Sequence, residues 1–255
     1  MFKEMKVYLL LSVVLMALLV AGCSGSGKSD INTEDPDKAF DIAKANYDKK
    51  DYVQAIEDFS LIKVKFSGTN ISDKAQFFLG MSYLKQQEYI LAAYEFEYLL
   101  KNYATSKYST DGRFQLAMCY FGMSPKWSLD QTYTHQAITE FKNFLELFPT
   151  DKNAPDAEAK IKELRNKLAY KELKSADLYL TMESYKAATI YYENVVSDYF
   201  DTDYADDALY GKINSLVVRK KYDLARTEIA RFESKFPGSN LLAKVKSLKN
   251  TLPLQ

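Results

Sequence analysis

The sequence has few of the side chains on which most catalytic and metal sites depend. Among 255 residues there is one histidine, His135, and there are two cysteines, Cys23 and Cys119. A lone histidine lacks the partners that a metal site or a general base needs, so we expect His135 to be an ordinary surface or capping residue. The chain also has no glycine-rich phosphate loop, no Cys/His cluster and no serine nucleophile elbow. The sequence therefore predicts a protein that is not an enzyme and that holds no metal or catalytic cofactor.

An excess of charge of one sign is missing as well. The 34 Lys and Arg residues balance the 34 Asp and Glu residues, so the formal net charge is zero. A balanced surface creates no field that attracts nucleic acid or anionic lipid, and we expect no nucleic-acid partner. With only two cysteines we expect no intrachain disulfide, and Cys119 is expected to be a small buried apolar residue.

The first 22 residues are expected to be a signal peptide that is removed. After a positively charged start, Val7 to Leu19 is an apolar run too short to favour a membrane-spanning helix. It leads into Val-Ala-Gly-Cys at 20–23, which resembles the bacterial lipobox, where the cysteine is acylated and becomes the new N-terminus. By that resemblance Cys23 carries a diacylglycerol and an N-acyl chain such as palmitate. The alternative is an ordinary cleaved signal with a chance cysteine. Ser24 follows in place of aspartate, which by the same resemblance implies the periplasmic face of the outer membrane.

From Ala39 to Tyr103 the sequence repeats itself at a spacing of 37 residues. The matched positions are Phe40/Phe77, Ile42/Leu79, Ala43/Gly80, Tyr52/Tyr89, Ala55/Ala92, Phe59/Phe96, Ile62/Leu99 and Phe66/Tyr103. Leu79-Gly80-x-x-Tyr83 followed by Ala92-x-x-x-Phe96 fits the tetratricopeptide (TPR) pattern, in which small residues let two antiparallel helices approach and large residues fill the space beside them. The sequence predicts an all-α protein, a right-handed α-solenoid of about five TPR helix pairs.

The period is interrupted twice. The two small positions of the third unit are 20 residues apart where earlier units use 12, which predicts a loop insertion at about 122–132. Fourteen further residues precede the fourth unit, and Pro155 to Lys174 is interpreted as part of one long helix with Asn153 as its N-cap. The period then returns, and 241–252 is expected to be a capping helix. We therefore divide the chain into a signal peptide (1–22), a lipid-anchored flexible tether (23–36), an N-terminal block with repeats 1–3 (37–150) and a C-terminal block with repeats 4–5 (151–255).

Three groups of residues are candidates for binding. Three phenylalanines recur on the first helix of successive units, and that helix lines the concave face of TPR folds. They would form an aromatic ladder in a groove for an extended client, unless their rings pack between repeats. The candidate groove residues are Phe40, Lys44, Tyr47, Phe77, Met81 and Phe114.

Trp127 in the inserted loop is either a partner contact or an anchor for its own loop. The third group is four clustered aspartates, Asp201, Asp203, Asp206 and Asp207. They lack the spacing of a calcium loop, so helix capping and solvation are favoured.

The chain as a whole resembles the BamD family of outer-membrane protein assembly factors, which are lipoproteins with five TPR repeats. The resemblance covers nearly the whole chain. It is carried by the lipobox with Gly22-Cys23-Ser24-Gly25-Ser26, Tyr52-x-x-Ala55-Ile56, the loop in the third repeat, the long helix before the fourth, and Asp198-Tyr199-x-Asp201-Thr202. Repeat motifs alone are weakly specific, whereas their number, the place of the insertion and the lipid anchor together are much more so.

The resemblance implies a non-enzymatic scaffold in the machinery that folds and inserts β-barrel proteins. In this family the C-terminal repeats bind the periplasmic POTRA region of BamA, other lipoproteins join the complex, and the N-terminal repeats are thought to recognise extended C-terminal segments of unfolded clients. A second hypothesis is a periplasmic TPR module that coordinates cell-wall synthesis or division, although such proteins often carry an N-terminal coiled coil that this sequence lacks. A third, a glycan- or small-ligand-binding lipoprotein, is disfavoured because such proteins are much longer.

Overall fold

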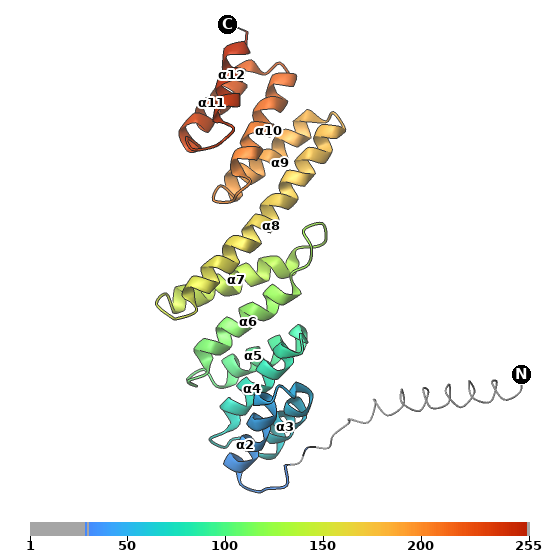
Figure 1. Ribbon diagram of the computed structural model, residues 1–255, viewed down its shortest axis with the longest axis vertical. Helices are drawn as coiled ribbons and strands as arrows, with labels where there is room; N and C mark the ends of the chain where they lie inside the picture. The colour runs from blue at the N-terminus through green and yellow to red at the C-terminus, as the bar shows by residue number, and fades with distance from the viewer. Residues whose placement is uncertain (1–28, 30, 254–255) are drawn as a thin grey trace, which may run out of the picture. The chain divides into compact units, whose positions relative to one another are not determined.

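The computed structural model describes residue 29 and residues 31–253, and every regular element in that part of the chain is an α-helix (Figure 1). The helices are α2 (Pro36–Asp48), α3 (Tyr52–Lys65), α4 (Ser72–Lys85), α5 (Tyr89–Asn102), α6 (Ser109–Met123), α7 (Thr132–Leu147), α8 (Ala154–Thr181), α9 (Tyr185–Asp198), α10 (Ala205–Val218), α11 (Tyr222–Lys235) and α12 (Leu242–Thr251). They form five successive pairs, from α2/α3 to α10/α11, followed by α12. The predicted all-helical TPR fold is confirmed.

The second helix of every pair buries the same stripe of side chains. Its small residue has no exposed surface in any pair: Ala55, Ala92, Ala137, Ala188 and Ala225. The large residue four positions later is also buried: Phe59, Phe96, Phe141, Tyr192 and Ile229. Burial of one such large apolar side chain contributes about 1.5–3 kcal/mol, so the stripe accounts for much of the stability of each pair.

Four of the five pairs are closed by the same strained turn. In each of these turns one non-glycine residue has a positive φ: Lys50 (64°), Gln87 (62°), Glu183 (55°) and Lys220 (57°). Its N–H donates to the carbonyl three residues earlier, and the next N–H donates to the carbonyl five residues earlier. This is the Schellman arrangement that ends a helix. A non-glycine residue in the left-handed region costs about 1–2 kcal/mol, so the helix pairs hold these residues in an unfavourable conformation.

The turns between successive pairs also repeat. At each one an N–H donates to the carbonyl of an aromatic residue three positions earlier, over 2.9–3.3 Å. The aromatic residues are Phe66, Tyr103, Phe148, Tyr199 and Phe236. At two of these turns a threonine hydroxyl, from Thr69 and from Thr202, donates to the same carbonyl over 2.7 Å. The recurrence of an aromatic residue at this position therefore has a structural origin, because it marks the turn that starts the next pair.

The third pair and the helix after it hold the two interruptions. Residues 124–131 form the loop between α6 and α7, and α8 is a single helix of 28 residues. Asn153 occupies the N-cap position of α8, but its side chain makes no capping hydrogen bond there. Its Nδ2 instead lies 3.5 Å from Oδ1 of Asp111. The predicted N-cap residue and the start of the helix are therefore confirmed, although the Asn153 side chain does not form the capping hydrogen bond.

The end of the predicted flexible tether is fixed on the first helix pair. Ile31 is buried, and the ammonium of Lys65 on α3 donates to the carbonyl of Thr33 over 3.0 Å and to Oε1 of Glu34 over 2.8 Å. The Asp35 carboxylate caps α2 by accepting from the N–H groups of Asp37 and Lys38. The chain from residue 31 onward is thus docked, because an apolar side chain and a helix cap hold it.

The contacts of the chain divide it into one compact unit that ends at Ser82 and a second that begins at Tyr83. In the first unit the rings of Phe40, Phe59 and Phe78 pack together, with centroids 5.7–5.8 Å apart. In the second unit each helix from α5 to α12 packs on the next, and α8 also contacts α10 (Figure 1). Tyr199 packs against two buried clusters of the described part of this unit, one around Phe141 and one around Val195. The division into blocks at residues 150 and 151 stays a prediction.

Candidate functional site

The three phenylalanines predicted to line an open groove have buried rings. Phe40 and Phe77 are 8% exposed and Phe114 is 5% exposed. The ring of Phe40 lies 5.7 Å from that of Phe59, and the ring of Phe114 lies 5.4 Å from that of Phe144. For Phe40 and Phe114, the second helix of their own pair closes over the ring. The predicted exposed aromatic ladder is therefore wrong, and the rings belong to the core.

The other groove candidates lie on a half-buried face of α2 and α4. The Lys44 ammonium is 2.6 Å from a carboxylate oxygen of Asp48 and 5.1 Å from the centre of the Phe78 ring. The Lys74 ammonium lies 4.3 Å above the Phe40 ring and 3.0 Å from Asp37. We call Lys44, Tyr47, Lys74, Phe78 and Met81 the α2–α4 face. It consists of aromatic rings with two ammonium groups above them, a chemistry suited to apolar side chains and carboxylates.

The inserted loop of the third pair is organised around one buried amide. Gln131 is 5% exposed, and its Nε2 donates to the carbonyl oxygens of Lys126, Trp127 and Leu129 over 2.9, 3.3 and 3.0 Å. Its Oε1 accepts a hydrogen bond of 2.7 Å from the hydroxyl of Thr134. A buried amide that satisfies several loop carbonyls gives the loop a defined backbone. The loop therefore presents its side chains in a fixed arrangement.

The long helix α8 holds this loop. The ammonium of Lys167 donates to Ser124 Oγ over 2.8 Å, and that of Lys171 donates to the Leu129 carbonyl over 2.6 Å. Partial burial of Lys167 lowers the pKa of its ammonium. The Trp127 ring meets the Tyr170 ring edge-on at 5.2 Å, yet the tryptophan remains 38% exposed. Trp127 thus anchors its own loop and still presents part of its surface to solvent.

The aspartate-rich turn between α9 and α10 is also clamped by α8. The Arg165 guanidinium donates to both carboxylate oxygens of Asp201, over 2.5 and 3.0 Å, and to the carbonyl of Asp198 over 2.7 Å. Asn166 exchanges two hydrogen bonds with Asp203, over 2.8 and 3.0 Å. The hydrogen bond from Arg165 holds the pKa of Asp201 below its usual value. No group of three or more His, Cys, Asp or Glu side chains in the described residues is placed to hold a metal ion. Asp201 and Asp203 thus fasten the turn to the long helix.

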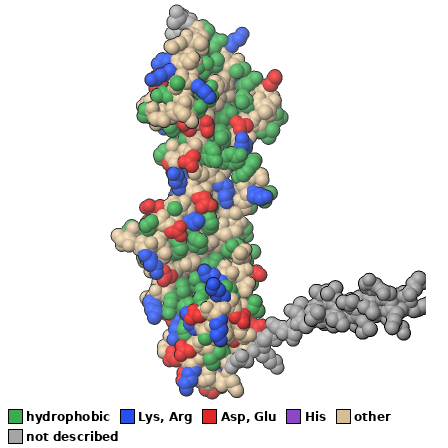
Figure 2. All heavy atoms as spheres, viewed as in Figure 1, with side chains coloured by type: hydrophobic (Ala, Val, Ile, Leu, Met, Phe, Trp, Pro, Cys, Tyr) green, Lys and Arg blue, Asp and Glu red, His purple; other side chains and the backbone are tan. Residues whose placement is uncertain are grey.

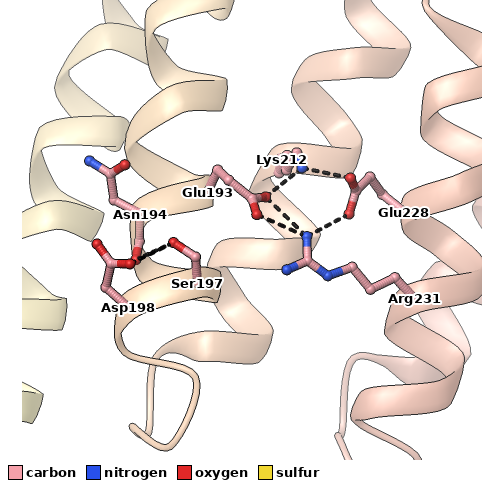
Figure 3. A network of polar contacts seen from close by, with 7 residues as sticks. All are labelled: Glu193, Asn194, Ser197, Asp198, Lys212, Glu228 and Arg231. Carbon is pink, nitrogen blue, oxygen red and sulfur yellow. Dashed lines mark hydrogen bonds and ion pairs between the residues drawn. The ribbon is translucent and has the colours of Figure 1, made fainter.

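A network of charges joins the last two helix pairs (Figure 3). Lys212 on α10 lies 2.5 Å from a carboxylate oxygen of Glu193 on α9 and 2.6 Å from one of Glu228 on α11. Arg231 on α11 lies 3.0 Å from a carboxylate oxygen of Glu193 and 3.2 Å from one of Glu228, so each glutamate contacts both basic residues. The side chains of Lys212 and Glu228 are only 11% and 15% exposed. The four residues link three successive helices.

The network shifts the pKa of two of its members, Glu193 and Arg231. Burial acts to raise the pKa of Glu193, but the hydrogen bonds and charges of Lys212 and Arg231 outweigh it and hold that pKa below its usual value. For Arg231, burial acts to lower the pKa, and the two glutamates outweigh this effect and raise it. The pKa of Glu193 is thus lowered and that of Arg231 raised, and both shifts favour the charged forms that form the ion pairs.

The remaining sequence candidates are readily placed. His135 is exposed on α7, and Cys119 is buried on α6. Burial raises the pKa of the Cys119 thiol to about 12, so the thiol stays protonated and unreactive. Cys23, the predicted lipid site, lies outside the described residues. Within the described part, no helix has the length and apolar content that a bilayer crossing requires.

A family model described as "YfiO: Outer membrane lipoprotein" matches residues 32–227. The chain belongs to this family. Curated relatives carry the name outer membrane protein assembly factor BamD, which confirms the family that the sequence resembles. The relative from Rickettsia prowazekii is 24% identical over 236 residues, covering 92% of this chain and 94% of that protein. The relative from Neisseria gonorrhoeae is 24% identical over 254 residues, covering 91% and 93%. A TPR-repeat protein from Bacteroides fragilis superimposes with a TM-score of 0.48 at 14% identity, covering 87% of this chain and 100% of that one.

Several residues that shape this BamD-family chain escaped the sequence analysis. Gln131 organises the inserted loop, Lys167 and Lys171 hold it, and Arg165 clamps the aspartate-rich turn. The clamps of α8 join residues 33–43 positions apart. No local pattern marks Arg165, Lys167 and Lys171, because only the fold brings these residues to their partners.

Proposed function

We propose that this chain is a non-enzymatic scaffold of the machinery that assembles β-barrel proteins in the outer membrane. The observation that carries the proposal is the family match over residues 32–227, joined by relatives of nearly the same length that are named assembly factors. Successive helix pairs provide long surfaces on which several proteins bind at once. Such a role needs protein contacts and a membrane anchor, and it needs no reaction or metal.

In this proposal the anchor is the lipid on Cys23. A single acyl chain binds a membrane only marginally. A diacylglycerol and an N-acyl chain on one cysteine supply several chains and therefore a stable anchor. The proposed tether after Cys23 gives reach, and from Ile31 onward the chain is docked on the first helix pair. The scaffold is thereby held at the periplasmic face of the outer membrane, where its effective concentration is high.

The proposal assigns extended client segments to the α2–α4 face. Exposed ion pairs are worth about 0–1 kcal/mol, so Lys44 and Lys74 exchange their own aspartates for a client carboxylate at little cost. The aromatic rings beneath accept apolar client side chains. This assignment replaces the aromatic ladder, whose rings are buried.

Client binding is tested with a labelled peptide that copies the last ten residues of a barrel protein, beside the same peptide amidated at its C-terminus. We expect the Lys44→Gln/Lys74→Gln double variant to bind the acid form several-fold more weakly and to bind the two forms alike. The matched control is Lys49→Gln/Lys50→Gln, which removes two exposed lysines of the same unit. Equal losses in both double variants would assign the effect to net charge instead of to this face.

A BamA-like partner is assigned to the C-terminal pairs. Exposed apolar side chains lie at or beside the turns that close the fourth and fifth pairs: Leu178, Met182, Val218 and Leu224. Apolar residues of this size on a turn edge are suited to a protein interface. Trp127 is a further candidate contact. On the face shown in Figure 2, acidic and basic side chains are interspersed, so apolar contacts are expected to carry more of the affinity than long-range attraction.

Co-purification of the full-length chain from detergent-solubilised membranes tests the partner. We expect a large barrel protein with periplasmic domains to remain bound, together with other lipoproteins. Met182→Glu/Leu224→Glu should reduce its recovery, whereas Ile190→Glu, at an equally exposed apolar position away from the turns, should not. Recovery of cell-wall or division proteins with no barrel protein would favour the periplasmic TPR module instead.

A further inference from the structure

A trough made of three adjoining clefts runs over α5, α6 and α7. The clefts have volumes of about 410, 270 and 430 Å³. The first two share Tyr94 and Glu97, and the last two share Tyr120 and Gln136. Because neighbouring clefts share walls, they form one continuous depression. We call it the tyrosine trough; the residues that carry its chemistry are Tyr94, Glu97, Tyr98, Tyr120, Tyr133 and Glu140.

The walls of the trough are stripes on two helices. Residues three or four positions apart face the same side of a helix. The stripe on α5 is Ile90, Tyr94, Glu97 and Lys101, and the stripe on α7 is Tyr133, Gln136 and Glu140. Helix α6 packs against both α5 and α7 (Figure 1). Tyr120 on α6 lies between the stripes, where its hydroxyl donates to Glu97 over 2.8 Å and its ring stacks on Tyr133 at 6.4 Å.

The trough exposes large apolar surface. Ile90 is 68%, Tyr94 58% and Tyr133 40% exposed. Tyrosine is enriched where one protein binds another, since its ring offers a large rigid contact and its hydroxyl a polar one. The stripe on α5 spans eleven helical steps of 1.5 Å, or about 17 Å, which matches about five residues of extended chain. The trough therefore has the length of a short peptide site.

The charge of the trough is negative at its centre. Glu97 is the one charged residue that lines the middle cleft, and Glu140 lines the next. Among the residues that the structure describes, neither carboxylate has an ion pair with a lysine or arginine. Burial, the hydrogen bond to Glu97 and the charges of Glu97 and Glu140 all raise the pKa of Tyr120. Both carboxylates therefore act on one ring, which places their charge beside the aromatic faces.

Two carboxylates that have no ion pair in the described part of the chain and lie beside tyrosine rings fit a cation. A lysine or arginine side chain would gain an ion pair with a carboxylate and a cation–π contact with a ring. An acidic segment would meet repulsion instead, and a purely apolar one would leave the carboxylates without compensation. We propose that the tyrosine trough binds an extended segment of a partner protein that carries lysine or arginine. The trough lies on α5, α6 and α7, away from the α2–α4 face and from the turns of the last pairs. Its test is therefore independent of the tests of the proposed function.

The probe is a labelled nine-residue peptide in which lysine and serine alternate, with a glutamate–serine peptide as its counterpart. Binding to the full-length chain in a neutral detergent is measured by fluorescence anisotropy. We expect the lysine peptide to bind at least tenfold more tightly than the glutamate peptide, with an affinity that falls as salt rises. Glu97→Gln/Glu140→Gln should weaken the lysine peptide about tenfold and leave the circular dichroism melt in place. Tyr133→Leu should weaken it several-fold.

The matched control is Glu146→Gln/Glu158→Gln, which removes the same charge from exposed glutamates of α7 and α8 that do not line the trough. It should leave the affinity for the lysine peptide unchanged. An equal loss in both double variants, or equal binding of the two peptides, would overturn the proposal. So would self-association of the chain that disappears in Glu97→Gln/Glu140→Gln, because the trough would then be occupied by a second copy.

Discussion

Replacing Lys212 by methionine tests whether the charge network holds the last helix pairs together. The substitution keeps the length of the side chain and removes the ammonium that bridges Glu193 and Glu228. Removing one partner of a fully buried ion pair costs about 3–5 kcal/mol. Here Arg231 still contacts both glutamates, and Glu193 is 37% exposed, so water and the guanidinium recover part of the loss. We therefore expect a destabilisation of about 2 kcal/mol.

The assay is thermal unfolding followed by circular dichroism. For a chain of this size, about 2 kcal/mol corresponds to a fall in Tm of roughly 4–8 °C. The double variant Lys212→Met/Glu228→Met should lose less than the sum of the two single variants, because one uncompensated carboxylate has been removed with its partner. Lys246→Met, at an exposed lysine of α12, is the control and should change stability by less than about 0.5 kcal/mol. A Lys212→Met chain as stable as the wild type, or strict additivity in the double variant, would refute the reasoning.

Three further predictions concern stability. Lys220→Gly relieves a positive φ and should stabilise by about 0.5–1 kcal/mol, whereas Arg219→Gly next to it, at a negative φ, should destabilise; urea titration distinguishes them. Gly211→Ala places a Cβ 2.5 Å from the ring of Tyr192 and should cost about 1–3 kcal/mol, visible as a lower Tm. Because the folded-state pKa of Glu193 is depressed, its stabilising contribution is complete above the ordinary value of 4.5 and is lost as pH falls through the lower folded value. The free energy of unfolding, measured between pH 7 and pH 3, should therefore decrease below about pH 4.5. In the Glu193→Gln variant it should decrease less over the same range.

Much of the fold follows from the repeat in the sequence. The spacing of Ala55 and Phe59, and of their counterparts 37 residues on, fixes which side of each second helix is buried, because side chains four positions apart share a face. The same reasoning located the loop in the third pair and the long α8, since each is a change in the distance between matched positions.

The first helices were harder to interpret. Phe40 and Phe114 recur at the period, but a period does not say whether a ring faces the partner helix of its own pair or the open surface. The structure turns these rings inward against Phe59 and Phe144. Of the two interpretations that the recurrence allowed, a groove or packing, the structure shows packing for these rings.

The surfaces could not be derived from the sequence for a physical reason. The tyrosine trough depends on stripes from α5 and α7 meeting over Tyr120, and that meeting is set by how consecutive pairs stack. The closing turns carry Lys50 and Lys220 where glycine would be the usual signal, so composition did not mark them as left-handed. Local sequence patterns determine the helices, whereas the candidate sites arise from contacts between helices.

Depletion of the protein in its own cells tests the central claim most directly. The amount of β-barrel proteins in isolated outer membranes is measured by quantitative mass spectrometry as the protein disappears. The assembly scaffold proposed here predicts that barrel proteins fall in abundance together, before division is disturbed, and that they recover when the wild-type chain is restored. Normal barrel levels in depleted cells that fail to divide would contradict the account.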